Sequence, residues 1–224
     1  MSAPTEAQCP MCDVAKIELY HIVNVDRLAS ILSMGYLCSD IYLSESGVSC
    51  GTSISYEHIR ERRRSICIER YPELTVGNCV PFYFGRHSPM LYRAMKGRND
   101  RYDYTGGQDP IVYLVFNMGH LLAWAEQNAV RWIFTDRNAS DHLAQQFYRI
   151  EDLDKLSWNV IKSKMWNGVS DIKAAEFLIE HRVPINECLL GVAVRTETVK
   201  RQVEQLFSIN NIEKPVKLYP TWYF

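Results

Sequence analysis

Short runs of β-branched and aromatic residues recur along the chain and predict β-strands. The first run covers residues 19–23, and each later run is bounded by Pro, Gly, Asn or Asp. The later runs cover residues 80–85, 111–117, 132–135, 189–194 and 216–219. Apolar positions at helical spacing predict helices over residues 121–128, 152–164 and 197–207. Because strands and helices mix without a regular alternation, the pattern favours the α+β class over a doubly wound sheet.

A helix is predicted directly after the first strand. Asp26 is suited to cap it, positions 28, 31 and 32 are apolar at helical spacing, and Gly35 is typical of a helix end. Residues 36–53 hold many Ser, Gly and Cys residues and few periodic apolar positions. That composition predicts a loop or poorly regular segment.

A second helix is predicted over residues 53–70, where positions 56, 59 and 66 form one apolar stripe. Arg62 and Arg63 flank this stripe. An arginine on the inward side of a helix usually holds an anion or a carboxylate, because a buried guanidinium without a partner is costly. Extension of the side chain to solvent is the alternative, and spacing leaves both open.

Two polar residues interrupt apolar segments. His21 lies inside the first predicted strand, where a hydrogen-bonded core residue is the ordinary explanation and a ligand contact the alternative. Glu176 lies in the apolar stretch 174–179, which is predicted to be buried whether it forms a helix or a strand. Since carboxylates are seldom buried without a partner, Glu176 needs either an arginine or a catalytic role.

Composition limits the class of protein. The chain has 224 residues, 47% of them hydrophobic, which suits one globular domain. No apolar run approaches the roughly 20 residues that span a bilayer, and residues 1–13 lack the pattern of a signal peptide. Seven scattered cysteines indicate reduced thiols. We therefore expect a cytoplasmic protein, and because Cys9 and Cys12 lack further nearby ligands, no metal.

Charge and aromatic residues leave nucleic-acid binding open. The net charge is −1, but five arginines outweigh two glutamates in residues 58–70, and five basic residues outweigh one aspartate in residues 86–101. Such clusters suit phosphate binding, and an ordinary solvated face is the alternative. Aromatic and basic residues also alternate through residues 131–166, as in single-strand binders, although core packing explains the tryptophans equally well.

The motifs of common enzyme classes are missing from the sequence. The chain contains no phosphate-binding P-loop, no Rossmann glycine fingerprint, no nucleophile elbow of the G-x-S-x-G type and no H-E-x-x-H zinc motif. The candidate chemistry therefore depends on His21, the arginines near position 63, and Glu176.

Six blocks of sequence resemble successive blocks of the DarT family, in the family's order. They lie at residues 19–22, 53–63, 80–84, 88–92, 134–136 and 175–178, and the final Trp-Tyr-Phe at 222–224 resembles the family's ending. The resemblance implies a single-domain ADP-ribosyltransferase fold with a split central β-structure. It also implies transfer of ADP-ribose from NAD to bases of single-stranded DNA, thymidine rather than guanosine. DarT proteins are toxins countered by the macrodomain antitoxin DarG, and we expect a monomer without membrane association.

The resemblance also assigns residues. Glu176 and Arg63 are implied to be catalytic, and residues 138–176 to form the loop that recognises the acceptor. The residues implied to contact or lie near NAD are Tyr20, His21, Ile22, Leu37 and Arg63. Cleavage of the nicotinamide–ribose bond develops positive charge on the ribose, which a buried carboxylate at position 176 is suited to stabilise. Arg63 can bind the diphosphate or help the acceptor base lose its ring proton.

Two positions depart from the family pattern. Asn138 stands where many thymidine-modifying members have histidine, and residues 85–88 lack a common proline. One alternative keeps the same chemistry: an ADP-ribosyltransferase whose acceptor is RNA or protein. An inactive module that binds nucleic acid or NAD is the alternative from another class, and the presence of His21, Arg63 and Glu176 argues against it.

Overall fold

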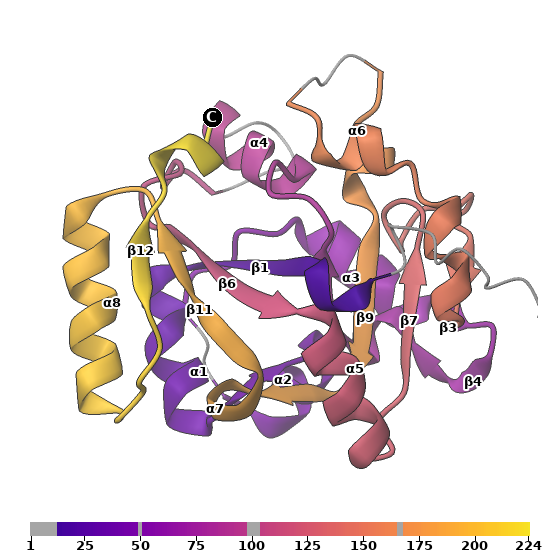
Figure 1. Ribbon diagram of the computed structural model, residues 1–224, viewed down its shortest axis with the longest axis horizontal. Helices are drawn as coiled ribbons and strands as arrows, with labels where there is room; N and C mark the ends of the chain where they lie inside the picture. Colours follow the sequence, from indigo (N-terminus) through magenta and orange to yellow (C-terminus); the bar gives the residue numbers. More distant parts are fainter. Residues whose placement is uncertain (1–12, 49–50, 98–103, 165–167) are drawn as a thin grey trace, which may run out of the picture.

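The computed structural model describes residues 13–48, 51–97, 104–164 and 168–224. The Cys9 and Cys12 pair, Arg98, Arg101 and Trp166 lie outside these ranges. A mixed eight-stranded sheet has the order β12-β11-β6-β1-β5-β9-β7-β8 (Figure 1). Its strands are β1 (Glu18–Asn24), β5 (Cys79–Tyr83), β6 (Ile111–Asn117), β7 (Trp132–Thr135), β8 (Gln146–Phe147), β9 (Glu176–Glu180), β11 (Leu189–Val194) and β12 (Val216–Leu218).

Two small sheets and several helices surround the main sheet. The small sheets pair β2 (Tyr36–Cys38) with β10 (Arg182–Pro184), and β3 (Cys67–Ile68) with β4 (Tyr71–Thr75). The α-helices are α1 (Leu28–Met34), α2 (Asp40–Ser46), α3 (Glu57–Ser65), α4 (Pro89–Lys96), α5 (Met118–Gln127), α6 (Trp158–Lys162), α7 (Ile185–Cys188) and α8 (Glu197–Ile209). The 3-10 helices are η1 (Val14–Lys16), η2 (Val25–Arg27), η3 (Val76–Asn78), η4 (Ile150–Lys155), η5 (Ile172–Ala174) and η6 (Pro220–Trp222).

The sheet opens between β1 and β5. β1 and β6 share seven register pairs, whereas β1 and β5 share the single pair Tyr20 and Tyr83. Two clusters of buried side chains lie on opposite faces of β1, one including Leu19 and Val23, the other Tyr20 and Ile22. This opening is the split expected for the central β-structure, and it leaves space beside β1 for a ligand.

The predicted α+β class is confirmed. Three predicted strands, over residues 111–117, 132–135 and 189–194, have the observed bounds of β6, β7 and β11, and the other three are displaced by one or two residues at their ends. Glu176 begins β9, which the sequence pattern left open between helix and strand. The helix over residues 197–207 is present as α8 and continues to Ile209.

The predicted loop over residues 36–53 is wrong. It contains β2 and α2, and α2 begins at a side-chain cap in which Ser39 accepts a hydrogen bond from the Tyr42 backbone. β2 is held by its pairing with β10, with Leu37 opposite Val183. A three-residue strand stabilised by a distant partner has no local signal in the sequence.

Two predicted helices are interrupted. The helix predicted over residues 53–70 spans only α3, because the chain becomes extended at Ile66 and enters β3. The helix predicted over residues 152–164 is divided into η4 and α6, and the indole of Trp158 donates to the Leu153 carbonyl across the break, at 2.7 Å.

The predicted helix cap at Asp26 is also wrong. Asn24 caps the short η2 helix, and the Asp26 carboxylate accepts hydrogen bonds from the backbone and hydroxyl of Thr52 instead. The predicted helix end at Gly35 is confirmed, since this residue adopts a left-handed φ of 73° and donates to Leu32.

Candidate active site

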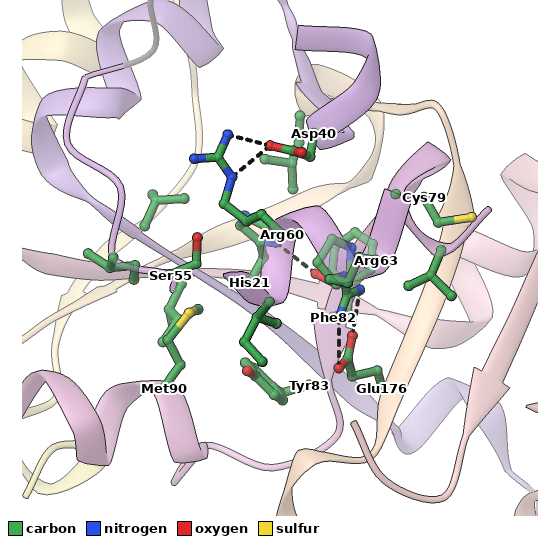
Figure 2. A pocket seen from close by; sticks show the side chains of 18 of the residues that line it. His21, Asp40, Ser55, Arg60, Arg63, Cys79, Phe82, Tyr83, Met90 and Glu176 are labelled. Atoms are coloured by element: carbon green, nitrogen blue, oxygen red, sulfur yellow. Dashed lines mark hydrogen bonds and ion pairs between the residues drawn. The ribbon is translucent and has the colours of Figure 1, made fainter. Parts of the chain in front are cut away.

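A cavity of about 410 Å³ lies where the main sheet opens. Its wall is formed by β1, β5, α1 to α3, the start of α4 and the first residue of β9 (Figure 2). This volume is within the range of small-molecule sites. Much of the wall is apolar, from side chains such as Ile31, Met34, Leu37, Ile54, Phe82 and Met90.

Glu176 is the buried acid of this cavity. Its side chain is 2% exposed, and Arg63 reaches it from α3 with Nη1 3.1 Å from Oε1 and Nη2 2.8 Å from Oε2 (Figure 2). Burial by itself lowers the pKa of Arg63, but the charge and hydrogen bonds of Glu176 outweigh it and raise that pKa. The pair is therefore a bidentate ion pair of the strong, charge-assisted kind.

The segment after β7 reaches the same carboxylate. The backbone N–H of Ala139 lies 3.3 Å from Glu176 Oε1 and donates to it. The neighbouring Asn138 lines the cavity, and its Oδ1 accepts from the backbone N–H and the hydroxyl of Ser140 at 2.8 and 2.7 Å. Because a backbone N–H only donates, the atom facing Ser140 must be the oxygen. The Asn138 amide group is thereby oriented, and its NH₂ stays available to a ligand.

His21 is held neutral at the opening of the sheet. Its Nδ1 lies 2.7 Å from the Pro81 carbonyl, an acceptor, so Nδ1 carries the proton. Burial lowers the pKa of His21 to about 4, and the charges of Arg27 and Arg63 act in the same direction. The other ring nitrogen, Nε2, is therefore unprotonated at neutral pH and can accept a hydrogen bond.

A second carboxylate in the wall, Asp40, is neutralised by two arginines. Arg60 contacts it at 2.7 and 2.9 Å (Figure 2). Arg64 contacts it at 2.7 Å. The hydrogen bonds and charges of both arginines outweigh burial and lower the pKa of Asp40. This network fixes α2 against α3 beside the cavity.

Five of the six site residues expected from the family resemblance line the cavity. They are His21, Ile22, Leu37, Arg63 and Glu176. Tyr20 does not line it. The Tyr20 side chain packs against Tyr113 and Trp222 instead, and its hydroxyl donates to Glu18 at 2.5 Å and accepts from Arg86 at 3.0 Å. Contact between NAD and Tyr20 stays a prediction. Only the backbone of Tyr20 is placed to make such a contact.

Asp40 and Arg27 were not singled out by the sequence, and Arg60 only as a member of the basic cluster at residues 58–70, although all three line the cavity. Asp40 falls in the segment expected to be a loop, and the Ser39 cap was the available signal. The expected basic cluster over residues 58–70 is largely neutralised, since Arg60, Arg63 and Arg64 all pair with carboxylates.

Within the described ranges, no group of three or more His, Cys, Asp and Glu side chains is placed to hold a metal ion. No helix in the same ranges is long and apolar enough to cross a membrane.

Comparison with known proteins identifies the family. Residues 20–224 match the family model described as "ssDNA thymidine ADP-ribosyltransferase, DarT". A DNA ADP-ribosyl transferase of Thermus sp. (strain 2.9) is 32% identical over 212 residues, covering 92% of this chain and 95% of the relative. Solved structures of Thermus sp. 2.9 DarT match with 93% of this chain covered. The complex with ADP-ribosylated ssDNA has a TM-score of 0.83 and 29% sequence identity, with 96% of its chain covered. The complex with NAD⁺ has a TM-score of 0.77 and 27% sequence identity, with 98% of its chain covered. The chain therefore belongs to the DarT family of DNA ADP-ribosyltransferases.

Proposed function

We propose that this protein transfers ADP-ribose from NAD to thymidine bases of single-stranded DNA. The observation that carries the proposal is the buried pair of Arg63 and Glu176 at the wall of the cavity. The bond between nicotinamide and ribose C1′ breaks, and its electron pair leaves with neutral nicotinamide. A ring nitrogen of the base then bonds to C1′ and gives up its proton, so charge and atoms balance.

Each site residue has a part in this reaction that follows from its surroundings. Glu176 stabilises the positive charge that develops on the ribose, and the contacts from Arg63 and Ala139 fix its carboxylate beforehand. The remaining donors of Arg63 face a diphosphate or the acceptor base. His21 contributes an unprotonated Nε2, while Ile22 and Leu37 contribute apolar surface.

The preference for single strands follows from the chemistry of the acceptor. In thymidine only the ring nitrogen N3 carries a proton, because N1 is bonded to the sugar, and in a duplex N3 is engaged in base pairing. An enzyme that attacks it needs an unpaired or extruded base. We assign recognition of this base to residues 138–176, since that segment begins at the Glu176 contact and ends at Glu176 itself.

The biological role that we propose is the toxin of a toxin–antitoxin pair. Modified template bases would block replication, and a macrodomain antitoxin of the DarG type would remove or prevent the modification. Such a protein acts in the cytoplasm, where bacterial DNA is accessible. We propose that it works as a monomeric single domain, since a single copy already forms a cavity with the Arg63 and Glu176 pair in its wall.

The test is incubation of the protein with NAD and a panel of oligonucleotides, followed by location of the added mass by base. Modification of thymidine in single strands, with release of nicotinamide, is the expected result. Modification of guanosine alone would overturn the choice of base. Modification of RNA or protein in place of DNA would support the second acceptor class, and binding without nicotinamide release would indicate an inactive module.

A further inference from the structure

Four arginines line the cavity, and three of them are already engaged. Arg60 pairs with Asp40 and Glu57, and Arg63 pairs with Glu176. Arg93 donates to the Gly97 carbonyl at 2.6 Å and has further interactions. Arg27 differs, since its guanidinium makes no ion pair or hydrogen bond with any side chain or backbone group in the described ranges.

The surroundings of Arg27 explain why it lacks a carboxylate partner. The neighbouring Asp26 accepts from the Thr52 backbone at 3.1 Å and from the Thr52 hydroxyl at 2.5 Å. The chain at Gly51 passes so close that an added Cβ there would lie 2.9 Å from Asp26 and 3.4 Å from Cγ of Arg27. The hydrogen bonds from Thr52 therefore occupy the Asp26 carboxylate, while the stem of Arg27 packs beside Gly51 at the cavity wall.

The two acids of the cavity wall leave the positive charge of Arg27 uncompensated. Asp40 is shared by two arginines and Glu176 is bound by one. The charge of Arg27 also acts on His21 inside the cavity. A guanidinium that is partly desolvated and unpaired costs free energy that an anionic ligand recovers on binding.

We propose that Arg27 binds the diphosphate of the ADP-ribose donor. The inference rests on the proposed function, in which NAD occupies this cavity. A planar guanidinium matches phosphate oxygens with two parallel hydrogen bonds, and the apolar residues around Arg27, such as Ile31 and Ile54, suit the heterocyclic parts of the same molecule. Arg27 is thus a binding residue for the donor, separate from the Arg63 and Glu176 pair.

The experiment compares ligands that differ in phosphate content. Binding of ADP-ribose, ADP and adenosine is measured by titration calorimetry for the wild type, Arg27→Met, Arg27→Lys and the control Arg62→Met. Arg62 is exposed on α3 and does not line the cavity. We expect Arg27→Met to weaken the binding of ADP-ribose and of ADP by about tenfold or more, the effect of losing a hydrogen bond to a charged group. The affinity for adenosine should be unchanged. Arg27→Lys recovers part of the loss, and Arg62→Met leaves the affinities for ADP-ribose, ADP and adenosine unchanged.

Kinetics supply the second measurement. Loss of a contact made equally in the ground and transition states raises KM for NAD and leaves kcat unchanged. Equal loss of adenosine affinity, or unchanged ADP-ribose affinity in Arg27→Met, overturns the assignment of Arg27 while the proposed function stands. Failure of the folded wild type to bind ADP-ribose or NAD at all overturns the proposed function and the Arg27 inference with it.

Discussion

The guanidinium of Arg63 and the carboxylate of Glu176 meet in a two-point contact, with nitrogen to oxygen distances of 3.1 and 2.8 Å. Glu176 is 2% exposed and Arg63 13% exposed, so each charge lowers the desolvation cost of the other. The contact also fixes the carboxylate in one orientation before any substrate arrives. Preorganised groups of this kind stabilise developing charge without reorganising during the reaction.

Replacing Glu176 by Gln is expected to remove nearly all ADP-ribosyl transfer while NAD binding is kept. The amide has nearly the same shape and can still meet Arg63, but it lacks the negative charge that stabilises the ribose in the transition state. Single-turnover transfer to a thymidine oligonucleotide and calorimetric binding of NAD measure the two effects. If the wild type is toxic when expressed, this variant should relieve the toxicity.

A matched control lies on the same strand. Glu180, at the other end of β9, is 12% exposed and pairs with Arg131 at 2.6 Å, but it does not line the cavity. Glu180→Gln should lower thermal stability to a similar degree and retain transfer. Loss of transfer in both variants would mean that the effect is destabilisation, and wild-type rates in Glu176→Gln would rule out its catalytic role.

Sequence patterns predicted the strands that have continuous apolar runs. The strands β6, β7 and β11 were located to the residue because each is a nearly continuous run of apolar residues. Burial of Glu176 was also predicted from its apolar neighbours. The family resemblance then supplied its chemical role, which burial alone had left open between a structural and a catalytic explanation.

The parts that escaped prediction depend on contacts between distant segments. β2 exists because of β10, and the pairing of Asp40 with Arg60 and Arg64 joins two helices that are separate in sequence. The basic cluster at residues 58–70 looked like a phosphate-binding surface because its acidic partners, Asp40 and Glu176, lie outside it. Net charge counted along the sequence cannot reveal such partners.

His21 gives a testable pH dependence of stability. Its pKa is lowered to about 4 in the folded protein, whereas an unfolded histidine has a pKa of about 6.5. As pH falls from 6.5 toward 4, the unfolded chain takes up a proton that the folded protein refuses, so the free energy of unfolding decreases. Above pH 6.5 His21 is neutral in both states and contributes no pH dependence.

The variant His21→Gln should lose this contribution. Its free energy of unfolding, measured with denaturant between pH 4 and 7, should fall less steeply with acidification than that of the wild type. His87 also has a pKa lowered by burial, but it is present in both proteins and cancels in the difference. Parallel curves for the two proteins would show that His21 is not held neutral by the fold.

DNA binding should depend on salt through a small number of arginines. In the cluster of residues 58–70, Arg62 and Arg70 are free of ion pairs in the described structure, and Arg70 lies 4.7 Å over the ring of Tyr148, which is 41% exposed. This combination of cation and aromatic ring suits an unstacked base. We therefore expect binding to single strands to exceed binding to duplexes.

When the logarithm of the affinity is plotted against the logarithm of the salt concentration, Arg70→Gln should make the slope shallower by about 0.7. That is the contribution of one phosphate contact to single-stranded DNA. Arg201→Gln makes the same charge change on α8, which packs against β11 and β12 at the far edge of the sheet. It should leave the slope unchanged. A salt-independent affinity, or equal modification of duplex and single strands, would contradict this account of DNA binding.

Changing Asn138 should alter the choice of base more than the cleavage of NAD. Asn138 presents an oriented amide beside the Glu176 contact, because Ser140 holds its Oδ1. A site that hydrogen-bonds the edge of a base rejects a wrong base strongly, since its donors and acceptors would otherwise stay unpaired. Asn138→Asp keeps the oxygen that faces Ser140 and removes the NH₂ donor. Asn138→His introduces the residue that many thymidine-modifying relatives carry.

The measurement is transfer to each of the four bases, made beside NAD hydrolysis without acceptor. We expect Asn138→Asp to weaken the preference for thymidine and Asn138→His to keep it. Both variants should retain most of the hydrolysis, because Arg63 and Glu176 are unchanged. Ser140→Ala is the matched control, since it removes one of two contacts that orient the amide and should give a smaller shift. Exchange of residues 138–164 for the segment of a guanosine-modifying relative should change the preferred base to guanosine, whereas the segment of a thymidine-modifying relative should leave thymidine preferred. A fixed base preference with collapsed hydrolysis would instead make the segment part of the NAD site, because only loss of donor binding or activation affects a reaction that has no acceptor.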